Sequence, residues 1–158
     1  MLINFIIPLI FQGIFEGIVL TFNSVIFLKT ELEWKKILLI ASICGSAVYI
    51  IRLVPMTFGL HVILGFIILS ILLKNIYKKP LLECFMSVIK SIILLSIFEI
   101  ICISLIVYIS GIKQEEIMAT PILKTLVLQP HILLMFLTGN LILKYRKINK
   151  EEREYLEL

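Results

Sequence analysis

Residues 81–110 read LLECFMSVIKSIILLSIFEIICISLIVYIS, a run in which Glu83, Lys90 and Glu99 carry the only charges. About 20 apolar residues suffice to cross the hydrocarbon core of a bilayer. As one α-helix the run would be about 45 Å long, well beyond the roughly 30 Å of that core. No helix breaker divides it, so we predict a single helix that starts at Pro80. Two short helices are the alternative, and they would make the number of membrane crossings even.

Polar residues in the first half of this run recur at helical spacing on one face: Glu83, Ser87, Lys90 and Ser91. Such a face suits the membrane interface, and the long Lys90 side chain can extend from the apolar region to the headgroups. We therefore predict that the first turns are partly interfacial and that the span proper begins near Lys90.

Four further apolar segments surround this run. The chain of 158 residues is 60% hydrophobic and 16% charged, against about 25% charged residues in a typical soluble domain, and its mean hydropathy is +1.09. We predict an all-α polytopic membrane bundle of about five transmembrane helices, with a transmembrane domain over 1–146 and a short charged tail over 147–158. The first segment lacks the basic flank and cleavage site of a signal peptide, so it is predicted to be a span. The four segments are 2–28, 37–54, 56–73 and 126–143.

The basic residues lie at the ends of the apolar segments. Eleven fall in one alternating set of connectors and three in the other. Because Lys and Arg mark the cytoplasmic side, we predict a multi-pass protein of the cell inner (plasma) membrane with its N-terminus outside and its C-terminus in the cytoplasm. This placement leaves no basic surface for nucleic acid, despite a net charge of +4. The eleven are Lys29, Lys35, Lys36, Lys74, Lys78, Lys79, Lys144, Arg146, Lys147, Lys150 and Arg153; the three are Arg52, Lys113 and Lys124.

Prolines shape the predicted outer connectors. A tight turn is predicted at Pro55, and residues 111–125 are predicted to include a short amphipathic piece that Pro121 interrupts. Pro130 is predicted to lie in the first turn of the last span, where its missing N–H costs little.

Five ionisable residues within the predicted spans are candidates for ligand binding, because such groups are costly in a membrane. They are Glu16, Arg52, His61, Glu99 and His131. Since His61 and His131 fall at a similar depth below the outer surface, we predict an outer polar cluster of Arg52, His61, Glu99 and His131. The alternatives are that Arg52 anchors to lipid phosphate and that Glu99 makes a structural hydrogen bond.

The first span carries a polar face in which Glu16 and Asn23 share one side of the helix with Gln12. Gly13 and Gly17 flank this face at the spacing typical of close helix packing. Two compatible interpretations follow, a helix-packing face with bonds to neighbouring helices and a site that faces a central cavity.

Enzyme motifs are nearly absent. The sequence has no HExxH, no Gly-rich phosphate loop and no Gly-x-Ser-x-Gly elbow. Cys44, Cys84 and Cys102 lack metal-ligand spacing and are predicted to be small packing residues. We therefore expect no enzyme, no metal and no cofactor.

One spaced set of residues extends across roughly residues 10–145. It consists of Glu16, Arg52, Pro55, Gly59, His61, Glu99, Pro130 and His131. The set resembles the multi-pass membrane sensor regions of Firmicute histidine kinases of the accessory-gene-regulator type. Such kinases continue into a dimerisation helix and an ATP-binding domain, which this sequence lacks, so the resemblance implies a sensor-like module without kinase activity.

Three classes of function are compatible with these features. The first is a sensor-like or regulatory module that binds a ligand, peptide or lipid in its outer half and acts through a membrane or cytoplasmic protein partner. The second is a small transporter or channel subunit, in which Glu16 and Glu99 of a homo-oligomer bind a proton or cation. The third is a structural subunit of a membrane complex, with a stripe of small residues facing the partner: Ala41, Ser42, Gly45 and Ser46.

Overall fold

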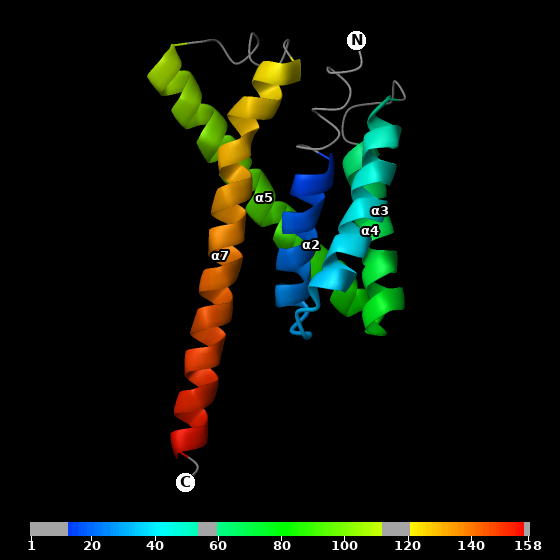
Figure 1. The fold of residues 1–158 in the computed structure, drawn as a ribbon, viewed down its shortest axis with the longest axis vertical. Coiled ribbons are helices and arrows are strands. Elements are labelled where there is room, and N and C mark those ends of the chain that lie inside the picture. The colour runs from blue at the N-terminus through cyan, green and yellow to red at the C-terminus, as the bar shows by residue number, and fades with distance from the viewer. Residues whose placement is uncertain (1–12, 54–59, 112–120, 157–158) are drawn as a thin grey trace.

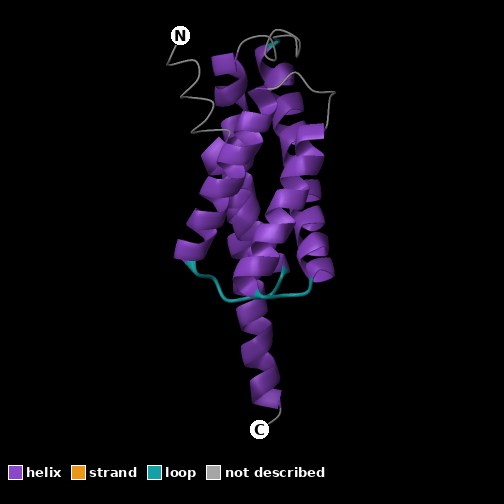
Figure 2. Cartoon of the chain, turned by 90° about the vertical axis from the view of Figure 1, so that its right-hand side faces the viewer, coloured by secondary structure: helices purple, strands orange, loops and turns teal. Residues whose placement is uncertain are grey.

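The computed structural model describes residues 13–53, 60–111 and 121–156, and the regular structure within these ranges is entirely helical (Figures 1 and 2). This confirms the predicted all-α class. The helices are α2 (Glu16–Phe27), α3 (Trp34–Leu53), α4 (Leu60–Tyr77), α5 (Leu81–Ser110) and α7 (Pro121–Leu156). Two of them contain stretches long and apolar enough to cross a membrane, Trp34–Ile51 and Leu81–Ser110, while Gly13–Phe27 and Val62–Tyr77 are shorter apolar helices.

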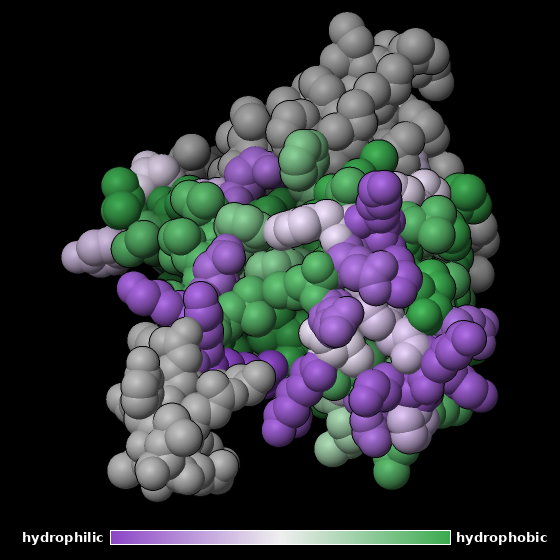
Figure 3. All heavy atoms as spheres, turned by 60° about the horizontal axis from the view of Figure 1, so that its bottom comes forward, coloured by the Kyte–Doolittle hydropathy of each residue, from purple (hydrophilic) through white to green (hydrophobic). Residues whose placement is uncertain are grey.

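Successive helices run in opposite directions between the two ends of the molecule (Figure 1). The connectors after α2 and α4 lie at the same end, beyond which α7 projects (Figure 2). Lys29 and Lys78 follow the last turns of α2 and α4 with left-handed backbones, at φ of 56° and 52°, where a helix end commonly has Gly. We call this the basic end, because Lys29 and Lys78 lie there, and hydrophilic side chains gather on this face (Figure 3). The described members of the set of eleven Lys and Arg residues therefore share one end of the fold, as predicted.

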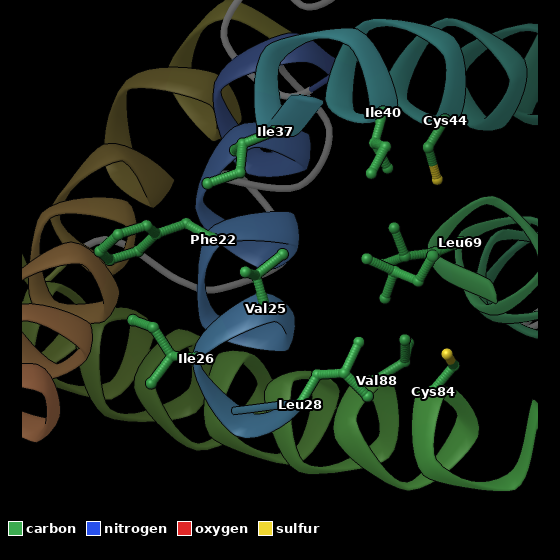
Figure 4. Packing of buried hydrophobic residues seen from close by; sticks show 11 residues of the cluster. Phe22, Val25, Ile26, Leu28, Ile37, Ile40, Cys44, Leu69, Cys84 and Val88 are labelled. Atoms are coloured by element: carbon green, nitrogen blue, oxygen red, sulfur yellow. The ribbon is translucent and has the colours of Figure 1, made fainter. Parts of the chain in front are cut away.

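Helix α2 is the centre of the bundle. It packs against α3, α5 and α7, while α4 covers α3 and α5. The buried aliphatic core lies where these helices meet, with Val25 of α2, Leu69 of α4 and Val88 of α5 among its members (Figure 4). The three cysteines are buried and free, which agrees with their predicted role as small packing residues.

Helices α2 and α3 cross at their glycines. A Cβ atom on Gly45 would lie 2.4 Å from the carbonyl oxygen of Gly13, and one on Gly17 would lie 3.1 Å from that of Ala41. Only glycine allows backbones to approach so closely. The packing interpretation of the glycines is therefore confirmed, and Ala41 and Gly45 face α2 of the same chain rather than an external partner.

Helix α5 is continuous over the predicted 81–110 and crosses the bundle obliquely (Figure 1). It ends at Gly111, whose φ of 69° is left-handed and whose N–H donates to the Val107 carbonyl. The prediction of one helix rather than two is confirmed. The predicted polar face is wrong in part, because Ser87 and Ser91 are buried while Glu83 and Lys90 are exposed.

The last helix differs from its prediction. It begins at Pro121 and runs to Leu156, so Pro130 lies inside it rather than in its first turn. Pro121 takes the helix-opening position, where no N–H is needed, and its fixed φ starts a helix instead of interrupting one. The proposed Pro55 turn and the part of the outer amphipathic piece over 112–120 lie outside the described residues.

Candidate functional site

Helix α2 carries three buried polar side chains, Thr21, Asn23 and Ser24. They lie at the centre of a bundle whose outer surfaces are largely aliphatic. Because a buried polar group needs hydrogen bonds to be tolerated, the partners of Asn23 and Ser24 define how α2 is held by its neighbours. The Thr21 hydroxyl has no hydrogen-bond partner among the described residues.

Asn23 joins α2 to α7. Its Nδ2 donates to the carbonyl of Val19 in its own helix at 2.9 Å and to that of Met135 in α7 at 3.3 Å. Its Oδ1 lies 2.9 Å from where a Cβ of Gly139 would be, so a Cα hydrogen of that glycine points at the oxygen. A weak Cα–H···O contact thus takes the place of a conventional donor at an oxygen that has no other hydrogen-bond partner within the described residues.

Ser24 joins α2 to α5. Its Oγ lies 3.0 Å from Oγ of Ser91 and 2.8 Å from the carbonyl oxygen of Leu20. The Oγ of Ser91 lies 3.1 Å from the carbonyl oxygen of Ser87 in its own helix. Each hydroxyl has one hydrogen, so one serine donates to its own helix and accepts from the other. The pair is a buried interhelical hydrogen bond that either serine can donate.

Near the basic end, α7 is fixed by aromatic rings and by one cation. Phe22 stacks on Trp34 of α3, with centroids 5.4 Å apart, and meets Phe136 of α7 at 5.3 Å. Below these rings, a guanidinium nitrogen of Arg146 donates to the carbonyl of Ile26 in the last turn of α2. A cation at that position also complements the negative end of the α2 dipole.

The connectors at the basic end carry their own charge cluster. Lys36 Nζ pairs with Glu33 at 2.5 Å and lies 5.6 Å from the centroid of the Tyr77 ring. Burial and, to a lesser extent, the Glu33 carboxylate raise the pKa of the Tyr77 phenol above its usual value of 10.0. The pair is largely exposed, so it adds little stability.

The helical register brings three of the five predicted residues to one level. Helices α2 and α7 run in the same direction with Asn23 against Met135, and Glu16 and His131 lie seven and four residues before these two, about 10 Å and 6 Å along their axes. His131 lies eight residues, about 12 Å, before Gly139, which also contacts Asn23. Glu16 and His131 therefore both lie one to two helical turns from the Asn23 contact, on the side away from the basic end.

Helix α5 runs the other way and extends the same level. Ser91 meets Ser24, and Glu99 lies eight residues after Ser91 just as Glu16 lies eight before Ser24, about 12 Å in each helix. We call these three residues the Glu16–Glu99–His131 layer. His131 is 3% exposed, whereas the two glutamates are partly buried.

The described residues show how the members of the layer interact. Among the described residues no three His, Cys, Asp or Glu side chains are grouped closely enough to hold a metal ion. Glu16 and His131 each have a bonded or electrostatic interaction. Within the described ranges no hydrogen bond or ion pair involves the Glu99 carboxylate.

Arg52 and His61 belong to the other side of the bundle. Arg52 lies in the last turn of α3 and His61 in the first turn of α4, and these helices flank α2 on the side away from α7 (Figure 1). Their side chains lie outside the described residues, so the predicted four-residue cluster stays a prediction.

Several residues that hold the site together were not singled out from the sequence. Ser24 and Gly139 look like ordinary small residues of apolar helices, and Arg146 looks like one more topology signal. Ser91 was assigned to an interfacial polar face, whereas it is buried against α2. The usable signal was the spacing of Ser87 and Ser91 by four residues, which aligns two hydroxyls on one helix face.

No protein-family model matches the chain, and neither a curated protein nor a solved structure is detectably similar to it. The resemblance to the sensor regions of accessory-gene-regulator-type kinases therefore stays a prediction.

Proposed function

We propose that the chain is a multi-pass membrane protein with five spans, whose basic end lies in the cytoplasm. The proposal is supported by the distribution of polarity: α2 buries Asn23, Thr21 and Ser24, while large aliphatic side chains cover the outside of the other helices. In the most apolar window of α5 only 11% of the residues are buried. A soluble protein rarely exposes apolar patches of this extent, whereas a bilayer is a solvent that favours them.

The orientation is supported by the lysines of the basic end, which would lie in the cytoplasm. Single-cysteine variants at Lys35 and Ser110, made without the three native cysteines, test it. A membrane-impermeant maleimide applied to intact cells should label Ser110→Cys and leave Lys35→Cys unlabelled until the membrane is opened. The reverse pattern would overturn the orientation, and equal labelling of both in soluble extract would overturn insertion.

Within that frame we propose a sensor-like regulatory module that acts through a protein partner. The observation that supports it is the continuity of α7 from Pro121 to Leu156. One continuous helix carries buried His131 in the Glu16–Glu99–His131 layer and also forms the part of the chain that projects past the basic end (Figures 1 and 2). A ligand that binds in the outer half and favours one position of α7 would move the projecting tail with it.

The chemistry of the layer suits a ligand that donates hydrogen bonds or carries a positive charge. Glu16, Glu99 and His131 belong to three different helices at one level of the bundle, and carboxylate and imidazole groups can accept hydrogen bonds from such a ligand. Binding there would change how α7 packs against α2 and α5. The projecting tail would then lose contacts with its cytoplasmic protein partner, and this loss would be the signal.

The coupling can be measured without knowing the ligand. Spin labels at Lys35→Cys and Lys150→Cys, again without the native cysteines, report the distance between the bundle and the projecting helix. We expect His131→Ala to change this distance distribution and Leu133→Ala, an exposed neighbour on the same helix, to leave it unchanged. If His131→Ala keeps the parental distribution while Trp34 emission shows an intact fold, α7 does not couple the layer to the tail.

A further inference from the structure

Asn140 is an exposed amide on an otherwise apolar face of α7. Its Nδ2 donates to the Phe136 carbonyl of the same helix at 2.8 Å, and within the described residues this is its one hydrogen bond. Around it, Leu133, Leu137 and Leu141 are 61%, 50% and 65% exposed. One amide hydrogen and the Oδ1 acceptor thus face outward beside three leucines.

The depth of Asn140 makes that exposure costly in a membrane. Asn140 lies four residues, about 6 Å, before Lys144 on the same helix, and its neighbour Gly139 packs against Phe22 and Ile26 of α2. Lipid chains cannot satisfy an amide, whereas a second amide can. Exposed serines elsewhere, such as Ser42 of α3, differ because a hydroxyl can bond to its own helix.

We propose that this face of α7 binds the same face of a second copy of the chain, with the two Asn140 side chains hydrogen-bonded to each other across a two-fold axis. An amide carries both a donor and an acceptor. Two Asn140 side chains can therefore donate to and accept from each other, which an apolar partner surface could not do. A two-fold interface requires such self-complementarity. The leucines around Asn140 supply the apolar contact.

The position of α7 in the bundle leaves this face open. The helix packs on α2 and α5, which cover one side of it. In a dimer Lys144 lies near its own symmetry mate just outside the apolar layer, where water and salt screen the like charges. Pairing of α7 would also bring the two projecting tails side by side, next to any cytoplasmic partner. The inference rests on the proposed membrane insertion.

The test uses the full-length chain in liposomes. Dimer fraction is measured by single-molecule photobleaching at low protein density and by disulfide formation of Leu137→Cys in a background without native cysteines. We expect Asn140→Leu to weaken dimerisation about tenfold, the effect of losing two interhelical hydrogen bonds. The conservative variant Asn140→Gln keeps an amide and should retain most of the parental dimer affinity. Leu39→Cys, on the exposed face of α3, is the matched control and should not cross-link.

The outcomes separate this proposal from the proposed function. Asn140→Leu stays compatible with the apolar surroundings, and Trp34 emission verifies its fold. An unchanged dimer fraction in Asn140→Leu, a purely monomeric parent or equal cross-linking at Leu39→Cys would overturn the α7 interface while leaving membrane insertion intact. Failure of the maleimide experiment would instead overturn the membrane proposal itself.

Discussion

The close approach of Gly45 in α3 to the Gly13 backbone predicts the consequence of adding one methyl group. In Gly45→Ala the new Cβ would lie 2.4 Å from the Gly13 oxygen and 2.9 Å from its carbonyl carbon, and ordinary contact begins at 3.4 Å. Neither atom belongs to a side chain that can rotate away, so α2 and α3 must separate by about 1 Å. Overpacking of this kind costs about 1–3 kcal/mol, and the better helix propensity of Ala returns about 1 kcal/mol. The difference between the two leaves Gly45→Ala destabilised by up to about 2 kcal/mol.

Gly65 provides the matched control, because it also lies inside a helix. Its added Cβ would come within 2.8 Å of Val48, but only of the end of that side chain. A small shift of Val48 relieves the contact, so the gain in helix propensity should offset the strain. We expect Gly65→Ala to stay within about 0.5 kcal/mol of the parent.

The measurement is unfolding in mixed micelles with increasing SDS, followed by helical circular dichroism. The two alanine variants have the same composition, so a difference between them reports the crossing of α2 and α3 rather than a general property of alanine. If Gly45→Ala is as stable as Gly65→Ala, the close approach of Gly13 and Gly45 is refuted.

Three further outcomes follow from other contacts of α2. Phe22→Leu removes the ring stacked on Trp34, so the tryptophan emission should shift and its quenching by water-soluble agents should rise, while the same substitution at a lipid-facing phenylalanine leaves both unchanged. Ser91→Ala should cost only about 0.5–1 kcal/mol, because Ser24 can still donate to its own helix; a loss above about 2 kcal/mol would contradict a replaceable bond. Arg146→Met should lower the SDS midpoint more than a Lys replacement, since a lysine keeps the cation at the end of α2; equal losses would show that charge plays no part there.

The helical architecture followed from simple properties of the sequence. The apolar length of residues 81–110 and the absence of a breaker predicted α5 to its ends, and the alternating lysine connectors predicted which connectors share an end. The last helix extends beyond the predicted span of 126–143 at both ends, because hydropathy marks the part that lipid would cover, whereas a helix continues wherever its backbone bonds continue. Proline alone could not locate its start, since Pro121 and Pro130 are equally able to open a helix.

The candidate site was harder to predict because burial depends on which helices meet. Glu16, Glu99 and His131 were visible as ionisable groups in apolar segments, but their shared level depends on the Asn23 and Ser24 contacts, which join parts of the chain far apart in sequence. The sequence pattern grouped His61 with His131 by depth alone. Depth does not specify the side of the bundle, and α4 and α7 lie on different sides of α2.

The central place of α2 also affects how the protein can be made. Ser24 finds its interhelical partner on α5 and Asn23 on α7, and Met135 follows Asn23 by 112 residues. At about 5–20 residues synthesised per second, the last helix is added roughly 5–20 s after the first. During that interval α2 lacks the α7 carbonyl that Asn23 binds, so the earliest of the described helices is among the last to be completed. Slower synthesis between α3 and α7 should therefore lengthen the period in which the newborn chain is open to membrane chaperones and proteases.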